Sequence, residues 1–380
     1  MKKIKLKDIC NISAGGTPSR SNINYWNNGD IPWCKIGDFS GKYINQVKEN
    51  ITEEGLKNSS AKIFKRGTIL YTIFATVGEV AILEKESATN QAIAGLEIIN
   101  DEVDLEYLYY YLKSLKFVML KKSRGVAQNN INLGILKNIE IKIPDKMEQI
   151  NIAKILANIE KVIDEKNKQL KELNTIIKSQ FVEMFGDIKN SKFEINSIKK
   201  LIDTNIIKIN KKHKKSDIIK YVDISSIDNL KNEIISYKEY EVGLEPSRAQ
   251  QCLIKGDILI STVRPNLKNI AVNNYEENNV VGSSGFCVLR VNKCMKEYLL
   301  EVVKTEKFTN DMVLLATGAN YPAIRDKDIL DYKIAVPPIT LQNQFSEIVK
   351  QIDKQKFESM IQLEMMEKIY NMINDRRRYV

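Results

Sequence analysis

The chain has 380 residues, 43% of them hydrophobic, which is more than one core usually organises and enough to bury two. Lysine and arginine exceed aspartate and glutamate by 58 to 48. The formal charge of +10 favours an anionic partner, although a lysine-rich surface without a partner is as good an explanation. Five cysteines without a CxxC pair and a single histidine exclude a disulfide framework, a zinc ribbon and metal sites rich in His or Cys.

The same features indicate where the protein works. Cysteines of this number and spacing fit a reducing cytoplasm. Lys7 and Asp8 interrupt the N-terminus before the apolar segment of a signal peptide can form. No uncharged apolar run approaches the roughly 18 residues that a membrane span requires. We therefore expect a soluble, cytoplasmic protein.

A repeat runs through the chain at an offset of 189 to 193 residues. Four blocks return in the same order: 66–72 as 255–261, 125–131 as 318–324, 143–144 as 336–337, and Gln149 as Gln342. A unit of this length far exceeds the roughly 20 to 50 residues of a solenoid repeat. The repeat therefore predicts two domains of one design, each followed by a long helix.

From residue 1 to about 145, short apolar runs are separated by Gly, Asn and Ser. The runs 69–73, 80–83 and 92–99 are predicted strands. A helix is predicted from about 105 to 122, because apolar residues recur on one face, namely Leu108, Tyr111, Leu112, Leu115 and Met119. The first domain is therefore of mixed α and β type.

From 147 to 185 the chain has no Gly or Pro, and we predict one long helix, which Gly186 ends. At 1.5 Å per residue its length is roughly 55 Å. Lys166 and Gln180 interrupt the heptad seam of this helix. Apolar residues fill the other seam positions, namely Leu156, Ile159, Ile163, Leu170, Leu173, Ile177 and Met184.

The second domain extends to Pro337 and Pro338, and a second long helix is predicted from about 341 to 376. Its seam positions, found by shifting the first seam by 193, are Val349, Ile352, Leu363, Met366, Tyr370 and Ile373, with breaks at Lys356, Ser359 and Arg377. An apolar stripe of this length must be buried, and the other long helix is a suitable partner. The alternative is that each helix packs on its own domain.

The predicted fold class is therefore α+β, with two mixed α/β domains and two long helices that form an antiparallel coiled coil. The predicted boundaries are 1–145 for the first domain, 146–186 for the first helix, 187–338 for the second domain and 339–380 for the second helix.

Several kinds of chemistry are missing. His213 lies among lysines at 211–215, and we expect a solvated loop residue there and not a catalyst. The segment 37–43 has three residues between its glycines, where a phosphate-binding loop needs four. No GxGxxG follows a strand, and no Asn or Asp precedes a Pro-Pro-aromatic sequence typical of amino-methyltransferases. Carboxylates remain as metal ligands, so a magnesium-dependent nuclease stays open.

Polar residues in predicted loops suit DNA binding instead. Residues 15–22 form a polar loop, expected to be flexible, whose backbone amides and side chains can donate hydrogen bonds to phosphates or base edges. Arginine and side-chain amides read purines bidentately in the major groove. The candidates of the first half are Thr17, Ser19, Arg20, Lys35, Arg124, Gln128, Asn129 and Asn130; those of the second half are Arg264, Asn266, Lys268, Asn320, Tyr321 and Arg325.

A run of lysines in the second half is a candidate for sequence-independent attraction to phosphates, and it comprises Lys208, Lys211, Lys212, Lys214 and Lys215. A mobile charged loop that touches nothing is the alternative. Between the halves the scaffold positions repeat while the polar loops differ, as 76–79 differs from 265–268. The two domains are therefore expected to recognise different ligands, unless loops have simply drifted.

These motifs resemble those of the specificity subunit of a type I restriction-modification system. The resemblance covers the whole chain and is carried by 15–19, 30–38, 67–70, 128–131, and 143–144 with 148–149 before a long helix. The order of recognition domain, helix, recognition domain, helix also matches that family. The second half departs from the pattern, since it lacks a clear Gly-Gly-Thr-Pro-Ser loop.

The resemblance implies a non-catalytic, DNA-reading subunit without a cofactor or metal of its own. Each domain would read one half of a split, asymmetric target, and the helix pair would set the gap between the halves. Two methylation subunits would bring S-adenosylmethionine, and restriction (motor-nuclease) subunits would bring ATP and magnesium. The alternatives are a stand-alone magnesium-dependent DNA nuclease and a coiled-coil adaptor without sequence readout.

Overall fold

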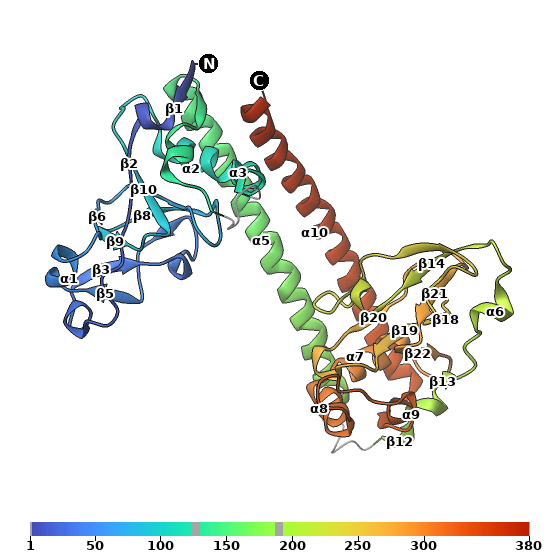
Figure 1. The fold of residues 1–380 in the computed structure, drawn as a ribbon. Helices are drawn as coiled ribbons and strands as arrows, with labels where there is room; N and C mark the ends of the chain where they lie inside the picture. Colours follow the sequence, from blue (N-terminus) through green and yellow to red (C-terminus); the bar gives the residue numbers. More distant parts are fainter. Residues whose placement is uncertain (1, 124–129, 187–192, 380) are drawn as a thin grey trace. The chain divides into compact units, whose positions relative to one another are not determined.

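The computed structural model describes residues 2–123, 130–186 and 193–379 (Figure 1). The chain divides into two compact units, each of which takes part of both long helices. Unit 1 comprises Met1–Asn167 with Met360–Val380, and unit 2 comprises Lys168–Ser359.

Unit 1 contains the first globular domain, called domain 1 here. Its strands are β1 (Lys2–Lys5), β2 (Cys10–Ala14), β3 (Ile31–Cys34), β4 (Tyr43–Ile44), β5 (Glu49–Ile51), β6 (Ile63–Phe64), β7 (Ile69–Thr72), β8 (Val80–Leu83), β9 (Ser87–Thr89), β10 (Ile93–Ile98) and β11 (Glu140–Ile143). Its helices are η1 (Leu6–Asp8), η2 (Ile23–Tyr25), η3 (Ile36–Asp38), α1 (Glu53–Lys57), α2 (Leu105–Ser114), α3 (Lys116–Ser123) and α4 (Leu133–Lys137). Among the described residues these strands form sheets of order β2-β10-β7-β8-β4, β5-β3-β9-β6 and β1-β11.

Unit 2 contains domain 2, which repeats this plan. Its strands are β12 (Glu194–Ser197), β13 (Ile202–Asp203), β14 (Ile218–Val222), β15 (Ile227–Asp228), β16 (Glu233–Ile234), β17 (Lys238–Glu241), β18 (Ala249–Cys252), β19 (Ile258–Ser261), β20 (Ile270–Val272), β21 (Val280–Ser283), β22 (Phe286–Val291) and β23 (Lys333–Val336). Its helices are η5 (Ile198–Lys200), α6 (Ile209–Lys212), η6 (Ile224–Ser226), η7 (Pro265–Leu267), α7 (Lys296–Lys304), α8 (Glu306–Leu315) and α9 (Asp326–Leu330). The sheets, as far as the chain is described, have the orders β13-β22-β19-β20-β16-β15, β17-β14-β21-β18 and β12-β23.

Matching hydrogen bonds show that the two domains share one scaffold. The hydroxyl of Tyr107 donates to the Lys142 carbonyl at 2.7 Å, and that of Tyr298 donates to the Ala335 carbonyl at 2.6 Å. The Ile131 amide donates to the Ile73 carbonyl, as the Ile324 amide does to that of Thr262. Each pair is separated from its counterpart by the offset of the sequence repeat. The predicted duplication of domains is confirmed at this level.

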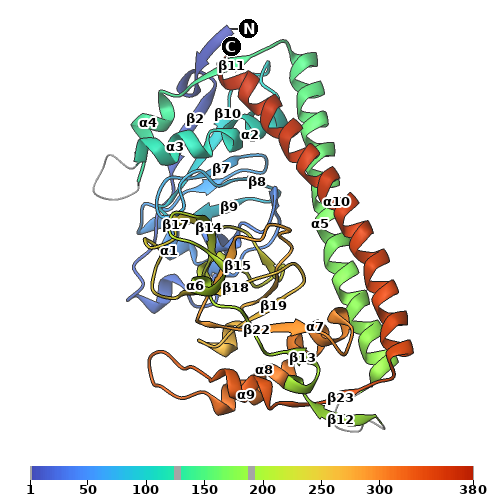
Figure 2. The same ribbon diagram turned by 90° about the vertical axis from the view of Figure 1, so that its right-hand side faces the viewer.

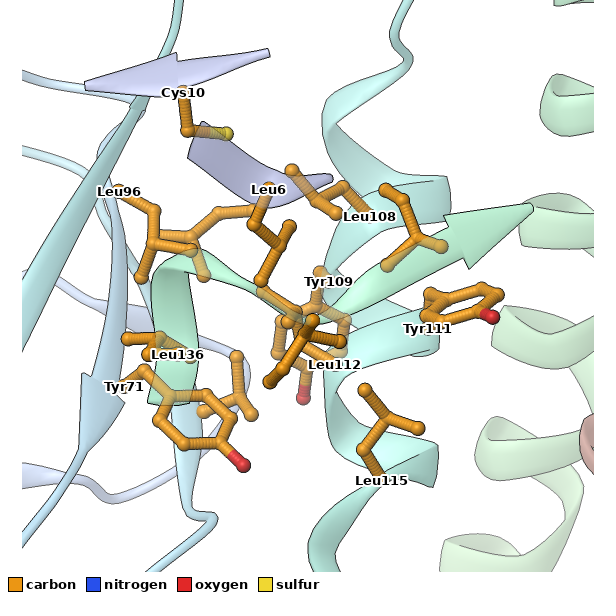
Figure 3. Close-up of a cluster of buried hydrophobic side chains, with 14 of the residues drawn as sticks. Leu6, Cys10, Tyr71, Leu96, Leu108, Tyr109, Tyr111, Leu112, Leu115 and Leu136 are labelled. Atoms are coloured by element: carbon orange, nitrogen blue, oxygen red, sulfur yellow. The ribbon is translucent and has the colours of Figure 1, made fainter. Parts of the chain in front are cut away.

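The core of domain 1 lies between α2 and the sheet (Figure 2). Strands β7, β8 and β10 confirm the three predicted strands, and they are buried along most of their length. Figure 3 shows the side chains of this cluster, in which residues of α2 face those of η1, the sheet and α4; the labelled ones are Leu6, Cys10, Tyr71, Leu96, Leu108, Tyr109, Tyr111, Leu112, Leu115 and Leu136.

The single helix predicted from 105 to 122 is wrong, because the chain forms two helices there, α2 and α3. The break lies at Leu115, whose amide bonds to the Leu112 carbonyl at 3.0 Å, three residues back. This tighter turn changes the direction of the chain after α2. Apolar periodicity did not reveal it, since Leu112, Leu115 and Met119 are buried before, at and after the break.

Two long helices follow the two domains, as predicted: α5 (Lys146–Phe185) and α10 (Ile339–Tyr379). Figures 1 and 2 both show them side by side within each unit. In unit 1 the hydroxyl of Tyr370 donates to Glu160 at 2.8 Å. In unit 2 Phe181 packs on Phe345 with 5.7 Å between ring centroids, and Ser359 donates to Gln169 at 3.4 Å.

The predicted seam residues lie on the covered faces of these helices. Those classed as buried are Leu156, Ile159, Leu173, Ile177, Val349 and Ile352. The others are half-buried, namely Ile163, Leu170, Leu363, Met366, Tyr370 and Ile373, as is Met184. The alternative of separate helices, each packed only on its own domain, is inconsistent with the contacts between α5 and α10 within each unit.

Candidate nucleic-acid interface

The loop after β2 begins with two glycines whose backbone amides are hydrogen-bonded to other strands, so this part of the loop is not flexible. The Gly15 amide donates to the Ile93 carbonyl at 3.1 Å, and the Gly16 amide donates to the Thr89 carbonyl at 2.9 Å. A side chain at Gly15 would come within about 2.2 Å of Thr89 atoms, so only glycine fits there. The prediction that these two amides are free to donate to DNA is therefore wrong. The glycines position the residues that follow.

Arg20 follows these glycines and is held by contacts with Trp26 and Glu49. Its guanidinium stacks over the Trp26 ring, 3.6 Å from the centroid, and donates to Glu49 Oε2 at 2.6 Å. Trp26 meets the buried Trp33 edge-on at 5.0 Å, and the Trp33 indole N–H donates to the Gly16 carbonyl at 3.0 Å. Arg20 keeps 53% of its side chain exposed, so it is fixed in place and still reachable by a ligand.

Glu49 also accepts from Lys35, through its other carboxylate oxygen. The hydrogen bond from Lys35 is the main reason that the pKa of Glu49 is lower than usual, with Arg20 adding to the effect. Two cations thus share one carboxylate on the surface of domain 1. The cluster as a whole remains positive and offers hydrogen-bond donors.

The neighbouring candidates of domain 1 have contacts of their own. The hydroxyl of Thr17 donates to Gln91, and the hydroxyls of Ser19 and Ser21 lie 2.8 Å apart. Asn130 is half-buried beside Ile131, which is bonded to the chain after β7. The predicted sites Arg124, Gln128 and Asn129 lie outside the described residues.

Domain 2 brings together two loops that are far apart in sequence. The Arg264 amide donates to the Pro322 carbonyl at 2.7 Å, and Val263 bridges Ala323. The Arg264 guanidinium then lies over the Tyr321 ring, 4.8 Å from its centroid. Arg264 adopts a left-handed backbone conformation with φ of 52°, as Ala75 does at the equivalent place in domain 1 with φ of 61°. The scaffold therefore repeats, while the side chain that it carries differs.

The remaining candidates of domain 2 either have an acidic partner or are exposed. Lys268 forms an ion pair with Glu306. Arg325 makes two hydrogen bonds to Asp328, at 2.8 and 3.2 Å, and stays 79% exposed. Asn266, Asn320 and Tyr321 are exposed. The structure thus gathers Arg264 with Tyr321, and it gives Lys268 and Arg325 acidic partners.

The lysine-rich segment extends from the residue before α6 to the turn after it. Lys208, Lys211, Lys212, Lys214 and Lys215 are all exposed. His213 differs from its prediction as a solvated residue, because only 9% of its side chain is exposed and its Nδ1 lies 3.7 Å from Asp217 Oδ2. His213 is the C-cap residue of α6 and its Nε2 is buried, whereas the lysines on either side of it are exposed.

Sequence reasoning missed Trp26, Glu49, Glu306 and Asp328, the partners of the candidate cations. Glu49 lies on β5, 29 residues from Arg20. The pairing of β3 with β5 sets Glu49 opposite Trp33, and the Arg20 guanidinium lies 4.9 Å from the centroid of the Trp33 ring. Of these four, only Asp328 could have been predicted from neighbouring residues. An acidic residue at the third position of a helix commonly accepts a hydrogen bond from the amide of the residue before the helix.

Within residues 2–123, 130–186 and 193–379, no group of three or more His, Cys, Asp or Glu side chains is arranged to hold a metal ion. No helix in that part of the chain is both long and apolar enough to cross a bilayer.

Comparison with known proteins gives a consistent result. The family described as type I restriction modification DNA specificity domain matches residues 1–175 and again 188–365. The type I restriction enzyme MjaIX specificity subunit of Methanocaldococcus jannaschii is 28% identical over 96% of this chain and 89% of its own. The HindI specificity subunit of Haemophilus influenzae is 34% identical, over 45% of this chain and 39% of its own.

Solved structures share the fold. A type I restriction-modification S subunit from M. genitalium aligns with a TM-score of 0.53 at 16% identity, covering 98% of this chain and 94% of that one. A chain from a study of complex assembly and conformational transition in the type I system aligns with a TM-score of 0.59 at 15% identity, covering 99% and 97%.

Proposed function

Because the chain belongs to the type I restriction-modification DNA specificity family and carries two copies of its domain, we propose that each domain reads one half of a split, asymmetric DNA target. Recognition of DNA sequence is the role of this family. The proposal of a split target rests on one observation: the scaffold of the two domains is the same, whereas their polar loops differ. The hydrogen bonds of the scaffold repeat, whereas Arg20 on Trp26 and Arg264 on Tyr321 stand on different loops.

The candidate residues divide by the part of DNA that they would contact. Arg20, Lys35 and Arg264 are held by neighbours and partly exposed, which suits base edges in the major groove. The lysines on and after α6 are exposed and suit phosphates, where charge matters more than geometry. Lys268 and Arg325 would have to exchange an acidic partner for DNA.

The long helices would form an antiparallel coiled coil that sets the gap between the half-sites. In unit 2 their contacts pair a later residue of α5 with an earlier residue of α10, as an antiparallel arrangement requires. The 40 residues of α5 correspond to about 60 Å of helix. Two readers on one face of B-DNA need centres roughly 34 to 36 Å apart, which a helix of this length can span. The domain boundaries at 145, 186 and 338 belong to this proposal.

The chain would be non-catalytic and would assemble in the cytoplasm with other subunits of the system. Two methylation subunits would supply S-adenosylmethionine, and restriction subunits would supply ATP and magnesium. A docking surface is available on α10 within unit 1, where Ile361, Met365, Ile369 and Met372 form one exposed apolar face. The equivalent positions of α5 are Lys168, Glu172, Ile176 and Ser179, so this surface is not repeated.

The deciding experiment is to express the chain with its methylation subunits and to map methylated adenines across a genome. A motif of two different halves around a fixed gap is expected. Methylation or cleavage by the purified chain alone would favour an enzyme, and binding to partners without base preference would favour an adaptor.

Shortening the helices tests the spacing. Removing one heptad from the middle of both α5 and α10 keeps the seam in register and shortens the pair by about 10 Å, or about three base pairs. The half-sites should stay and the gap should shrink. Removal from α5 alone is the matched control, since it misaligns the seam. An unchanged gap after the paired deletion would contradict a spacing role.

A further inference from the structure

A charged pair occupies equivalent positions in the two domains with its polarity reversed. In domain 1, β3 and β5 are antiparallel with Trp33 opposite Glu49. In domain 2, β14 and β17 are antiparallel with Tyr221 opposite Lys238. Trp33 and Tyr221 therefore correspond, and so do Glu49 and Lys238. An acid in one domain stands where the other domain has a base.

The partners of these two residues also correspond. Lys35 precedes η3, and its amide donates to Asp38 at 2.8 Å; Asp223 precedes η6, and its amide donates to Ser226 at 3.3 Å. Lys35 pairs with Glu49, and Asp223 lies 3.6 Å from Lys238. The ion pair is thus kept in place across the duplication, while the two charges are exchanged.

The exchange changes what each surface offers to DNA. In domain 1 both oxygens of Glu49 are occupied, one by Lys35 and one by Arg20, so the groups left over are N–H donors. In domain 2, Asp223 Oδ1 accepts from the amide and hydroxyl of Ser225 at 2.9 and 2.5 Å. Among the residues that the structure describes, its Oδ2 has one contact, with Lys238 at 3.6 Å. That oxygen can accept a further hydrogen bond.

Both pairs can be reached from solvent. The exposed fractions are 33% for Lys35 and 31% for Glu49, against 26% for Asp223 and 62% for Lys238. Donors suit N7 and O6 of guanine, while a carboxylate accepts from the amino group of cytosine or adenine. An ion pair with a structural role alone would not require the acidic and basic residues to be exchanged between the two domains.

We propose that the reversed pairs Lys35–Glu49 and Asp223–Lys238 set the base preference of the two domains. Domain 1 reads a guanine with Arg20 and Lys35, which Glu49 holds in position. Domain 2 reads an amino-bearing base with Asp223, which the hydrogen bonds from Ser225 hold in position beside Lys238. The inference rests on the proposed function, because it needs each domain to read its own half-site.

The test uses the complex of the full chain with its methylation subunits and a DNA library randomised in each half-site in turn. The wild-type complex should first select a split motif; if it does not, the proposed function fails and not only this inference. Glu49→Gln should then lower the preference for guanine at one position by about tenfold and leave the other half-site unchanged.

Asp223→Asn should weaken the preference for an amino-bearing base at one position of the opposite half-site. Glu53→Gln is the matched control, since it removes a carboxylate from an ion pair with Lys57 that is largely exposed on α1 of the same domain. This control should select the wild-type motif.

A change in the same half-site for both variants would overturn the proposal, as would unchanged preferences in both halves. An equal loss of affinity for target and scrambled DNA would also count against it. If Glu49→Gln lowers the melting temperature, the double variant Lys35→Asp with Glu49→Lys gives domain 1 the polarity of domain 2. It should select an amino-bearing base in place of guanine, and retention of guanine would refute the idea.

Discussion

Arg20 is held by contacts of two kinds, a stacking contact with Trp26 and an ion pair with Glu49. Stacking fixes the plane of the guanidinium, and the carboxylate uses only part of its five donors. The remaining donors of the side chain are therefore held in a fixed orientation before any ligand binds. Lysine would retain the charge but lose the stacking plane and the fork of donors.

We expect Arg20→Ala to weaken binding of the assembled complex to its target by about tenfold, and to relax the preference at one position of one half-site. Arg20→Lys should restore much of the salt-dependent binding but not the base preference. Equilibrium binding over a range of salt concentrations measures both effects.

Arg66→Ala is the matched control, since it removes an exposed arginine in the turn before β7. It should leave the preference intact. If Arg20→Ala kept the full base preference, Arg20 would not be a reader.

The pH dependence of stability should report the Glu49 ion pairs. The hydrogen bond from Lys35 lowers the pKa of Glu49 below its ordinary value of 4.5. A lowered pKa in the folded state contributes stability above the unfolded value, and this contribution is lost as the pH falls through the folded value. The stability difference between wild type and Glu49→Gln should stay constant from pH 7 to about 5 and shrink below about 4.5. Urea unfolding across this range measures it, and a constant difference down to pH 3 would contradict the pairing.

At the scale of elements, a buried glutamine near the first turn of each long helix forms hydrogen bonds to the domain that precedes the helix. Gln149 accepts from the Asp104 amide at 2.8 Å and donates to the carbonyls of Glu102 and Pro144. Gln342 accepts from the Met295 amide at 2.8 Å and donates to the Pro337 carbonyl. Both side chains are almost fully buried, so the bonds have no solvent substitute.

Gln149→Ala and Gln342→Ala should each destabilise the protein by about 1 to 3 kcal/mol, because buried backbone groups lose their partners. Hydrogen exchange should show the loss of protection at residue 104 in the first variant and at residue 295 in the second. Gln344→Ala, at an exposed position of α10, should change stability by no more than about 0.5 kcal/mol. Equal effects of all three would mean that the buried bonds are not anchors.

At the scale of the whole molecule, the chain is expected to work only in an assembly. The apolar face of α10 formed by Ile361, Met365, Ile369 and Met372 is the surface that we assign to a partner subunit. The apolar face comprises residues 361, 365, 369 and 372, and the seam comprises 363, 366, 370 and 373. Each set recurs with helical spacing, and the two sets lie on different sides of the helix.

The double variant Met365→Glu with Ile369→Glu should retain fewer methylation subunits on co-purification while its melting temperature is kept, because a desolvated carboxylate is costly. Asn371→Glu is the control, since it adds a carboxylate to an exposed polar position of the same helix. Undiminished assembly of the double variant would place the partner elsewhere.

Much of this organisation could be predicted without coordinates. The repeat offset, the two long helices and their seam follow from periodicity and from glycine and proline positions, which are local properties of the chain. The division of the predicted helix into α2 and α3 could not be predicted, because buried Leu112, Leu115 and Met119 continue the apolar pattern through the turn.

The sequence by itself determined that there are two domains of one design, that long helices follow them, and that polar loops differ between them. Only the tertiary structure decided which charges meet. Arg20 and Lys35 share Glu49, Arg264 lies on Tyr321, and Asp223 faces Lys238, because strand register and loop bridges join residues distant in sequence. Such pairings depend on where backbones pass each other, and no spacing within the sequence encodes that distance.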